Sequence, residues 1–112
     1  MLDVLRALVV FGGALWMSEL PGTISQLHVE SPGYSVDRKT LESAVKELER
    51  EGVVSAEKAK RATERGAEDD VLVKLRDEKV RVELSGDPVI SRYFSYFSES
   101  WERLRREGWR GA

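Results

Sequence analysis

The sequence predicts an α+β fold in which three helices and a β-hairpin are followed by a long C-terminal helix. Apolar residues recur at helical spacing through the first half of the chain. Two runs that alternate apolar and charged residues come next, and Asp87-Pro88 is a typical helix start. The 112 residues are enough for one ordinary domain. We divide them into a domain over residues 1–86 and a C-terminal helix over residues 87–112.

The composition restricts the classes of function. Charged residues make up 34% of the chain, but the formal net charge is only −2, so any contact with nucleic acid must come from a local basic patch. The absence of cysteine excludes disulfides, thiolate zinc sites and thiol nucleophiles. The sequence also lacks asparagine and has Gln26 as its only glutamine, a composition typical of thermophile proteins.

The apolar run between Val4 and Met17 does not read as a targeting or membrane segment. It is too short to span a bilayer, and Asp3 stands before it where a signal peptide carries basic residues. We therefore expect a soluble, cytoplasmic protein whose first helix is buried.

Local signals predict the first two helices. The first covers residues 2–11 and ends at Gly12-Gly13, because glycine readily adopts the left-handed conformation past a helix end. Ser18 is placed to cap the second helix, whose buried face carries Leu20, Ile24 and Leu27. The Pro-Gly pair within residues 30–34 then predicts a turn.

A third helix follows Asp37, which is placed as its cap. Its apolar stripe consists of Leu41, Val45 and Leu48, and Gly52 ends it before the extended pair Val53-Val54. The opposite face is basic and polar at its N-terminal half, where we expect exposed side chains.

Residues 55–65 are open to two interpretations. Helix propensity favours a surface helix with Ala56, Ala59 and Ala62 packed inward, whereas the position after Val53-Val54 favours a strand that leads into a basic loop. We prefer the strand. A hairpin is expected further on, where residues 71–75 and 80–84 alternate with period two and are joined by Asp77-Glu78.

The segment Leu-Glu-Arg-Glu-Gly-Val-Val at residues 48–54 resembles the winged helix-turn-helix family. Regulators of the MarR, ArsR and PadR types end their recognition helix in a very similar way, and residues 36–41 resemble the start of those helices. The resemblance covers the first two thirds of the chain, with one departure, a longer turn over residues 30–34. It implies a three-helix core with a β-wing, sequence-specific binding to double-stranded DNA and a role in transcription regulation.

Two groups of residues are candidates for DNA contacts. An α-helix fits the major groove, so the outward face of the third helix would read bases or bind phosphates through Arg38, Lys39, Thr40, Ser43 and Lys46. Within the wing, phosphate contacts would come from Lys58, Lys60, Arg61 and Arg65. The alternative for the third helix is a solvated face held by pairs such as Glu42–Lys46.

The last helix carries an apolar seam. Its residues are spaced alternately by four and three, which is a heptad pattern, and they are Ile90, Phe94, Phe97, Trp101 and Leu104. We expect this seam to form the interface of a homodimer, and the alternative is that the helix folds back on its own core. The helix is expected to run to about Glu107.

Other classes of function find less support. The sequence shows no phosphate-cradling loop, catalytic triad or paired catalytic carboxylates, and His28 is the only histidine, so we expect no enzyme, no metal site and no cofactor. No pattern indicates a small-molecule effector, although a pocket beside the last helix would be one place for it. The main alternative is a winged-helix protein-interaction module, which the net acidity favours.

Overall fold

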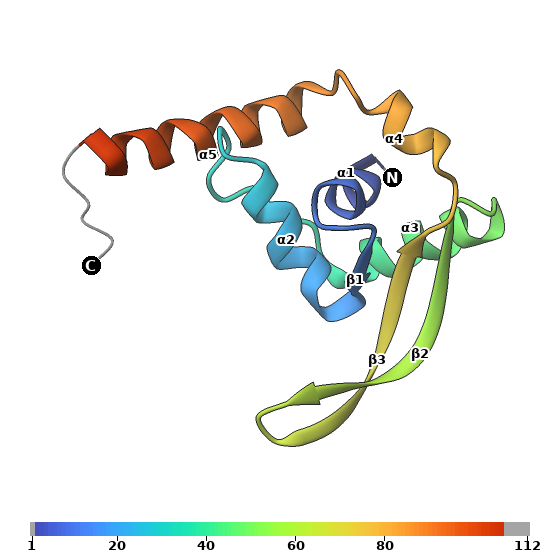
Figure 1. Ribbon diagram of the computed structural model, residues 1–112. Helices are drawn as coiled ribbons and strands as arrows, with labels where there is room; N and C mark the ends of the chain where they lie inside the picture. The colour runs from blue at the N-terminus through green and yellow to red at the C-terminus, as the bar shows by residue number, and fades with distance from the viewer. Residues whose placement is uncertain (1, 107–112) are drawn as a thin grey trace.

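The computed structural model describes residues 2–106, and its secondary structure is of the α+β class (Figure 1). Within this range the chain forms five α-helices, one short 3-10 helix and a three-stranded antiparallel sheet. In chain order the elements are α1 (Leu2–Val10), β1 (Ala14–Trp16), η1 (Met17–Glu19), α2 (Leu20–Leu27), α3 (Arg38–Arg50), β2 (Val54–Thr63), β3 (Gly66–Leu75), α4 (Lys79–Glu83) and α5 (Pro88–Arg106). None of these helices is long and apolar enough to cross a membrane.

The sheet has the order β1-β3-β2, and its main part is a long hairpin. β2 and β3 pair over their whole length, from Val54 opposite Leu75 to Thr63 opposite Gly66. The two-residue turn between the strands ends at Gly66, whose φ of 112° is the left-handed conformation that glycine tolerates. Figure 1 shows the tip of this hairpin projecting well beyond the helices.

The core lies between α1, α2, α3 and the inner half of the sheet. The stripe predicted for α3 is buried, as are Leu8 on α1 and Ile24 on α2. From the sheet, Val54 and Val73 complete this cluster. Because α3 buries only its apolar stripe, its opposite face is left in solvent.

The strand interpretation of residues 55–65 is confirmed, since they lie in β2 and the hairpin turn. The hairpin predicted around Asp77-Glu78 is wrong. Residues 71–75 do belong to a strand, but their partner is β2, and residues 79–83 form the short helix α4. Val80 and Leu84 are buried one helical turn apart, while Val82 is 74% exposed. Apolar residues at every second position over so short a run fit a helix as well as a strand.

The predicted caps were correct for two helices and wrong for a third. Asp37 accepts a hydrogen bond of 2.8 Å from the backbone N–H of Thr40, and Asp87 accepts one of 3.0 Å from that of Ile90. Ser18 does not cap α2, because the chain first turns through η1 and Glu19 occupies the cap position. The Ser18 hydroxyl instead donates to Asp70 on β3, at 2.5 Å.

A buried polar network joins α1 to the loop before α3 and to the start of α5. Asp3 accepts hydrogen bonds from Tyr34 and from Arg6 (3.0 Å), and Nε2 of His28 lies 2.9 Å from its Oδ1. Arg6 also donates two bonds of 2.9 Å to Asp87. The only histidine is therefore a structural residue.

This network shifts the acidity of its two carboxyl groups. Burial alone would raise the pKa of Asp3, but the hydrogen bonds from Tyr34, His28 and Arg6 outweigh it and hold that pKa below its ordinary value. Burial would likewise raise the pKa of Asp87, but Arg6 and the backbone N–H of Ile90 lower it. Both groups are therefore ionised at neutral pH and tie α5 to the core.

Candidate nucleic-acid interface

The outward face of α3 carries all five residues predicted for it. Arg38, Lys39, Thr40, Ser43 and Lys46 are exposed in the described part of the chain, while the apolar stripe faces the core. The face is fixed by the Asp37 cap at one end and by the burial of Leu48 near the other. The hydrogen bonds from Thr40 lower the pKa of Asp37, so its carboxylate stays ionised as a cap.

The charges on α3 fall into paired and unpaired groups. Nε of Arg38 donates to Oε1 of Glu42 at 2.9 Å, and Arg50 pairs with Glu47 at 3.1 Å. The pair Glu42–Lys46, considered above as an alternative, does not form. Within residues 2–106 neither Lys39 nor Lys46 has an acidic partner, so both cations are available to an external anion.

A groove of about 290 Å³ separates α3 from the hairpin. Its floor is apolar and consists of Met17, Val45, Ala56 and Val71. Its rim carries charges of both signs, namely Arg38, Lys46 and Lys58 with Glu42 and Glu49. Since Lys58 and Lys60 are two residues apart on β2, they share the face of the hairpin that borders this groove.

The other basic residues of the hairpin lie elsewhere. Arg61 points to the opposite face, where it donates to the Ser18 hydroxyl at 2.9 Å and lies 3.7 Å from Asp70. Arg65 stands in the turn at the tip. Lys58 and Lys60 therefore lie on the side of the hairpin that faces α3. Arg65 lies at the far end of the hairpin, and Arg61 links the hairpin to η1.

Acidic residues on β3 offset the basic residues on β2. Nζ of Lys60 lies 2.6 Å from Oδ1 of Asp69, and Glu68 is directly opposite Arg61 in the register. The Lys60 ammonium lowers the pKa of Asp69. Between residues 57 and 70 the hairpin holds five acids and four bases, so it has no basic excess as a whole. Sequence reasoning missed this because it counted the charges of one strand alone.

The apolar seam of α5 is divided between the core and the surface. Ile90 is buried against the core, and the ring of Tyr93 packs edge-on against Phe11 with centroids 5.9 Å apart. Beyond this point the seam is exposed, with Phe94, Phe97, Trp101 and Leu104 each about half accessible to solvent. Figure 1 shows α5 running past α2 and away from the helical core, so the helix does not fold back on its own domain over this stretch.

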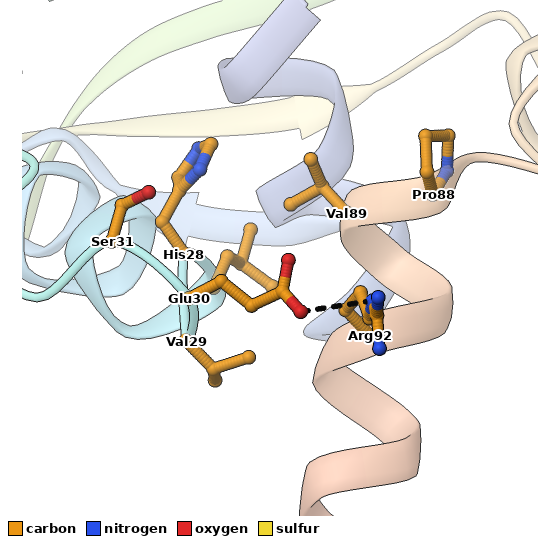
Figure 2. Close-up of a pocket in the computed structure, with 8 residues that line it drawn as sticks. His28, Val29, Glu30, Ser31, Pro88, Val89 and Arg92 are labelled. Atoms are coloured by element: carbon orange, nitrogen blue, oxygen red, sulfur yellow. Dashed lines mark ion pairs between the residues drawn. The ribbon is translucent and has the colours of Figure 1, made fainter.

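A second cleft, of about 330 Å³, lies between the loop after α2 and the first turns of α5. Figure 2 shows Glu30 of the loop directed at Arg92 of α5, and their ion pair measures 3.0 Å. Val29 and Val89 form apolar walls, and among the described residues that line the cleft His28 is the one with an aromatic ring. This cleft lies beside the last helix, but none of the aromatic residues of α5 lines it.

Acidic and imidazole groups do not gather into a metal site in the part of the chain that the structure describes. The neighbouring acids Asp69 and Asp70 each pair with a cation of β2 instead. No protein-family model matches the chain, and no curated protein matches its sequence. Among the surfaces of the described residues, the exposed basic face of α3 beside the hairpin groove is the strongest candidate site.

Proposed function

We propose that the chain is a winged helix-turn-helix protein that binds double-stranded DNA as a homodimer and regulates transcription in the cytoplasm. In this proposal α2 and α3 form the helix-turn-helix and the β2–β3 hairpin is the wing. The observation that carries the proposal is the outward face of α3, where Lys39 and Lys46 are exposed without acidic partners among the described residues.

The width of α3 supports insertion into the major groove, which admits one α-helix. Lys39, Ser43 and Lys46 follow one another along the outward side of the helix, at spacings of four and three residues. The lysines would contact phosphates on the two walls of the groove, while Thr40 and Ser43 have hydroxyls that bond either phosphates or base edges.

The hairpin contributes less than its four bases imply, because Lys60 and Arg61 are engaged by acids. Lys58 on the groove rim and Arg65 at the tip remain for the DNA backbone. Four cations in all, two from α3 and two from the hairpin, would neutralise about four phosphates per subunit. The logarithm of affinity should then fall with the logarithm of salt concentration with a slope of about −4 per subunit.

The homodimer is supported by the residues that flank the α5 seam. In the heptad pattern the flanking positions hold Ser91, Tyr93, Ser98 and Ser100, and Arg105 is the only charged residue among them. When two copies of α5 pair along this seam, almost no residues of like charge face one another across the interface. A twofold pair would present two α3 helices to successive major grooves, about 34 Å apart.

Binding to a mixed-sequence duplex of about 24 base pairs, measured across a salt series, tests this function. The double variant Lys39→Ala/Lys46→Ala should bind more weakly and reduce the salt slope by about two per subunit. Lys79→Ala removes an exposed lysine of α4, outside the proposed surface, and is the matched control that should bind like the wild type. Absence of binding at about 50 mM salt would overturn the proposal.

One observation favours a second candidate, a protein-interaction module. The groove beside α3 has an apolar floor and carries Glu42 and Glu49 on its rim, features that suit a peptide as well as a nucleic acid. This candidate predicts a chain that dimerises normally but does not bind DNA at low salt.

A further inference from the structure

The ion pair between Arg38 and Glu42 stands where α3 borders the groove. Both side chains are about half exposed, at 58% and 46%, and both belong to the groove rim. Arg38 is the first residue of the helix and Glu42 lies one turn later on the same side. In the proposed docking this end of α3 is the one that approaches the base edges.

The contact with Glu42 uses only one of the donor groups of the Arg38 guanidinium, so the others can bind a second group. Glu42 accepts a hydrogen bond from Nε, and within residues 2–106 the two terminal Nη groups of Arg38 have no acceptor. These two groups form a planar fork that matches a pair of acceptors side by side. Guanine presents such a pair, O6 and N7, in the major groove, whereas adenine presents N7 beside an amino donor.

Helix stability accounts only weakly for these residues. The first turn of α3 contains no acid and starts with two cations, although the positive end of a helix dipole disfavours cations there. An exposed ion pair with the base N-terminal to the acid is also the weaker of the two orientations. A role outside the folded domain would account for an arginine at this position.

We propose that Arg38 recognises a guanine in the major groove and that Glu42 is a positioning residue which holds the guanidinium in the required orientation. This inference rests on the proposed DNA-binding function and deepens it, since it names the base that α3 reads. The target sequence of each subunit should accordingly contain an invariant G·C pair at one fixed position.

Selection of bound duplexes from a randomised pool, followed by titration of the selected duplex and its single-pair variants, tests the inference. The wild type should prefer the G·C pair over A·T by about tenfold or more. Arg38→Ala removes every donor of the fork and should lose this preference, whereas Arg38→Lys, whose ammonium can still donate to O6 or N7, should keep part of it. Glu42→Ala should weaken the preference, and Glu42→Gln, which keeps an acceptor for Nε, should restore most of it.

The pair at the other end of the same helix provides the matched control. Arg50 and Glu47 are also an exposed ion pair of α3, but they lie in its last turn, away from the proposed base contacts. Arg50→Ala and Glu47→Ala should leave the G·C preference intact. Thermal unfolding of every variant would show whether a loss of preference comes from a loss of structure.

The outcomes separate the two proposals. If the wild type binds no duplex at low salt, both the proposed function and this inference fail. If it binds DNA but selects no fixed guanine, or if Arg38→Ala keeps the G·C preference, DNA binding stands and the inference is overturned. Loss of preference in the Arg50→Ala control would also overturn it, since the effect would then not be particular to Arg38.

Discussion

The helices α3 and α5 carry the same kind of apolar stripe, but only α3 buries the whole of it. Leu41 and Val45 are almost inaccessible to solvent, whereas Phe97 on α5 is 62% exposed. α3 lies against α1, α2 and β2, while α5 is held to the domain only by its first turns. Periodicity therefore shows that a helix has an apolar face but leaves open which partner covers that face.

Shortening the stripe of α3 should have the largest effect on stability. Leu41→Ala leaves a cavity in the centre of the core and should lower the free energy of unfolding by about 4 kcal/mol. Phe97→Ala, measured at a protein concentration where the chain is monomeric, should change it by less than about 0.5 kcal/mol. Urea unfolding followed by circular dichroism gives both values, and equal losses would contradict the distinction between the two helices.

The junction of α5 with the core should have the next largest effect. Asp87→Asn removes the charge that pairs with Arg6 and should lower the free energy of unfolding by about 2 to 3 kcal/mol. Asp77→Asn is a suitable control, because Asp77 is also bonded to a backbone N–H at a helix start but has no buried arginine beside it. A variant at position 87 as stable as this control would show that the ion pair contributes little.

The same junction predicts a dependence on pH. The pKa values of Asp3 and Asp87 are lower in the folded protein than the ordinary value of 3.8. The stability they contribute is therefore fully present above pH 3.8 and is lost as the pH falls through their lowered pKa values. In chemical unfolding at a series of pH values, the wild type should weaken below this point more steeply than Asp87→Asn. Parallel curves would contradict the assignment.

Changing the exposed seam should affect association more than folding. The double variant Phe94→Ser/Phe97→Ser removes two aromatic rings from the proposed dimer interface and should raise the dimer dissociation constant by about tenfold or more. Analytical ultracentrifugation measures this, with Tyr96→Ser as a control for an exposed ring that lies outside the heptad seam. A wild-type chain that remains monomeric at high concentration would exclude the dimer.

The smallest effect is expected on α4, where the strand interpretation was wrong. Val82→Ser should change the free energy of unfolding by less than about 0.5 kcal/mol, since the side chain is already in solvent. Val80→Ala should cost about 1 to 2 kcal/mol because Val80 is buried. Similar losses at both positions would indicate a strand with Val80 and Val82 on one face.

Signals that act within a few residues predicted much of the fold. The caps Asp37 and Asp87 bond to backbone groups three residues away, and the stripe of α3 needs only the helical period. The hairpin was misplaced because its partner strand had to be chosen among segments with similar alternation. β1 was not predicted, since three residues are too short for a periodic signal and become a strand only by pairing with β3.

In the candidate site, too, local patterns could be predicted from the sequence, whereas contacts between distant segments could not. The outward residues of α3 could be named from the sequence, because a buried stripe determines the opposite face. The neutralisation of Lys60 by Asp69 depends on the register of two strands, and the link from Asp3 to His28 spans 25 positions of the chain. Contacts of this kind leave no local pattern in the sequence. The hydrogen bond between Asp3 and His28 was therefore not predicted.

Asp87 bonds to Arg6 of α1 and to the first turn of α5, so this carboxylate, together with buried Ile90 and the Glu30–Arg92 ion pair, sets the direction in which α5 leaves the domain. In the proposed twofold dimer on DNA, that direction would set how far apart the two halves of the DNA site must be. Substitutions at this junction would therefore alter the preferred number of base pairs between the halves while leaving the sequence read within each half unchanged. Under the proposed function, the spacing of the two halves and the recognition of bases would therefore depend on different ends of the domain.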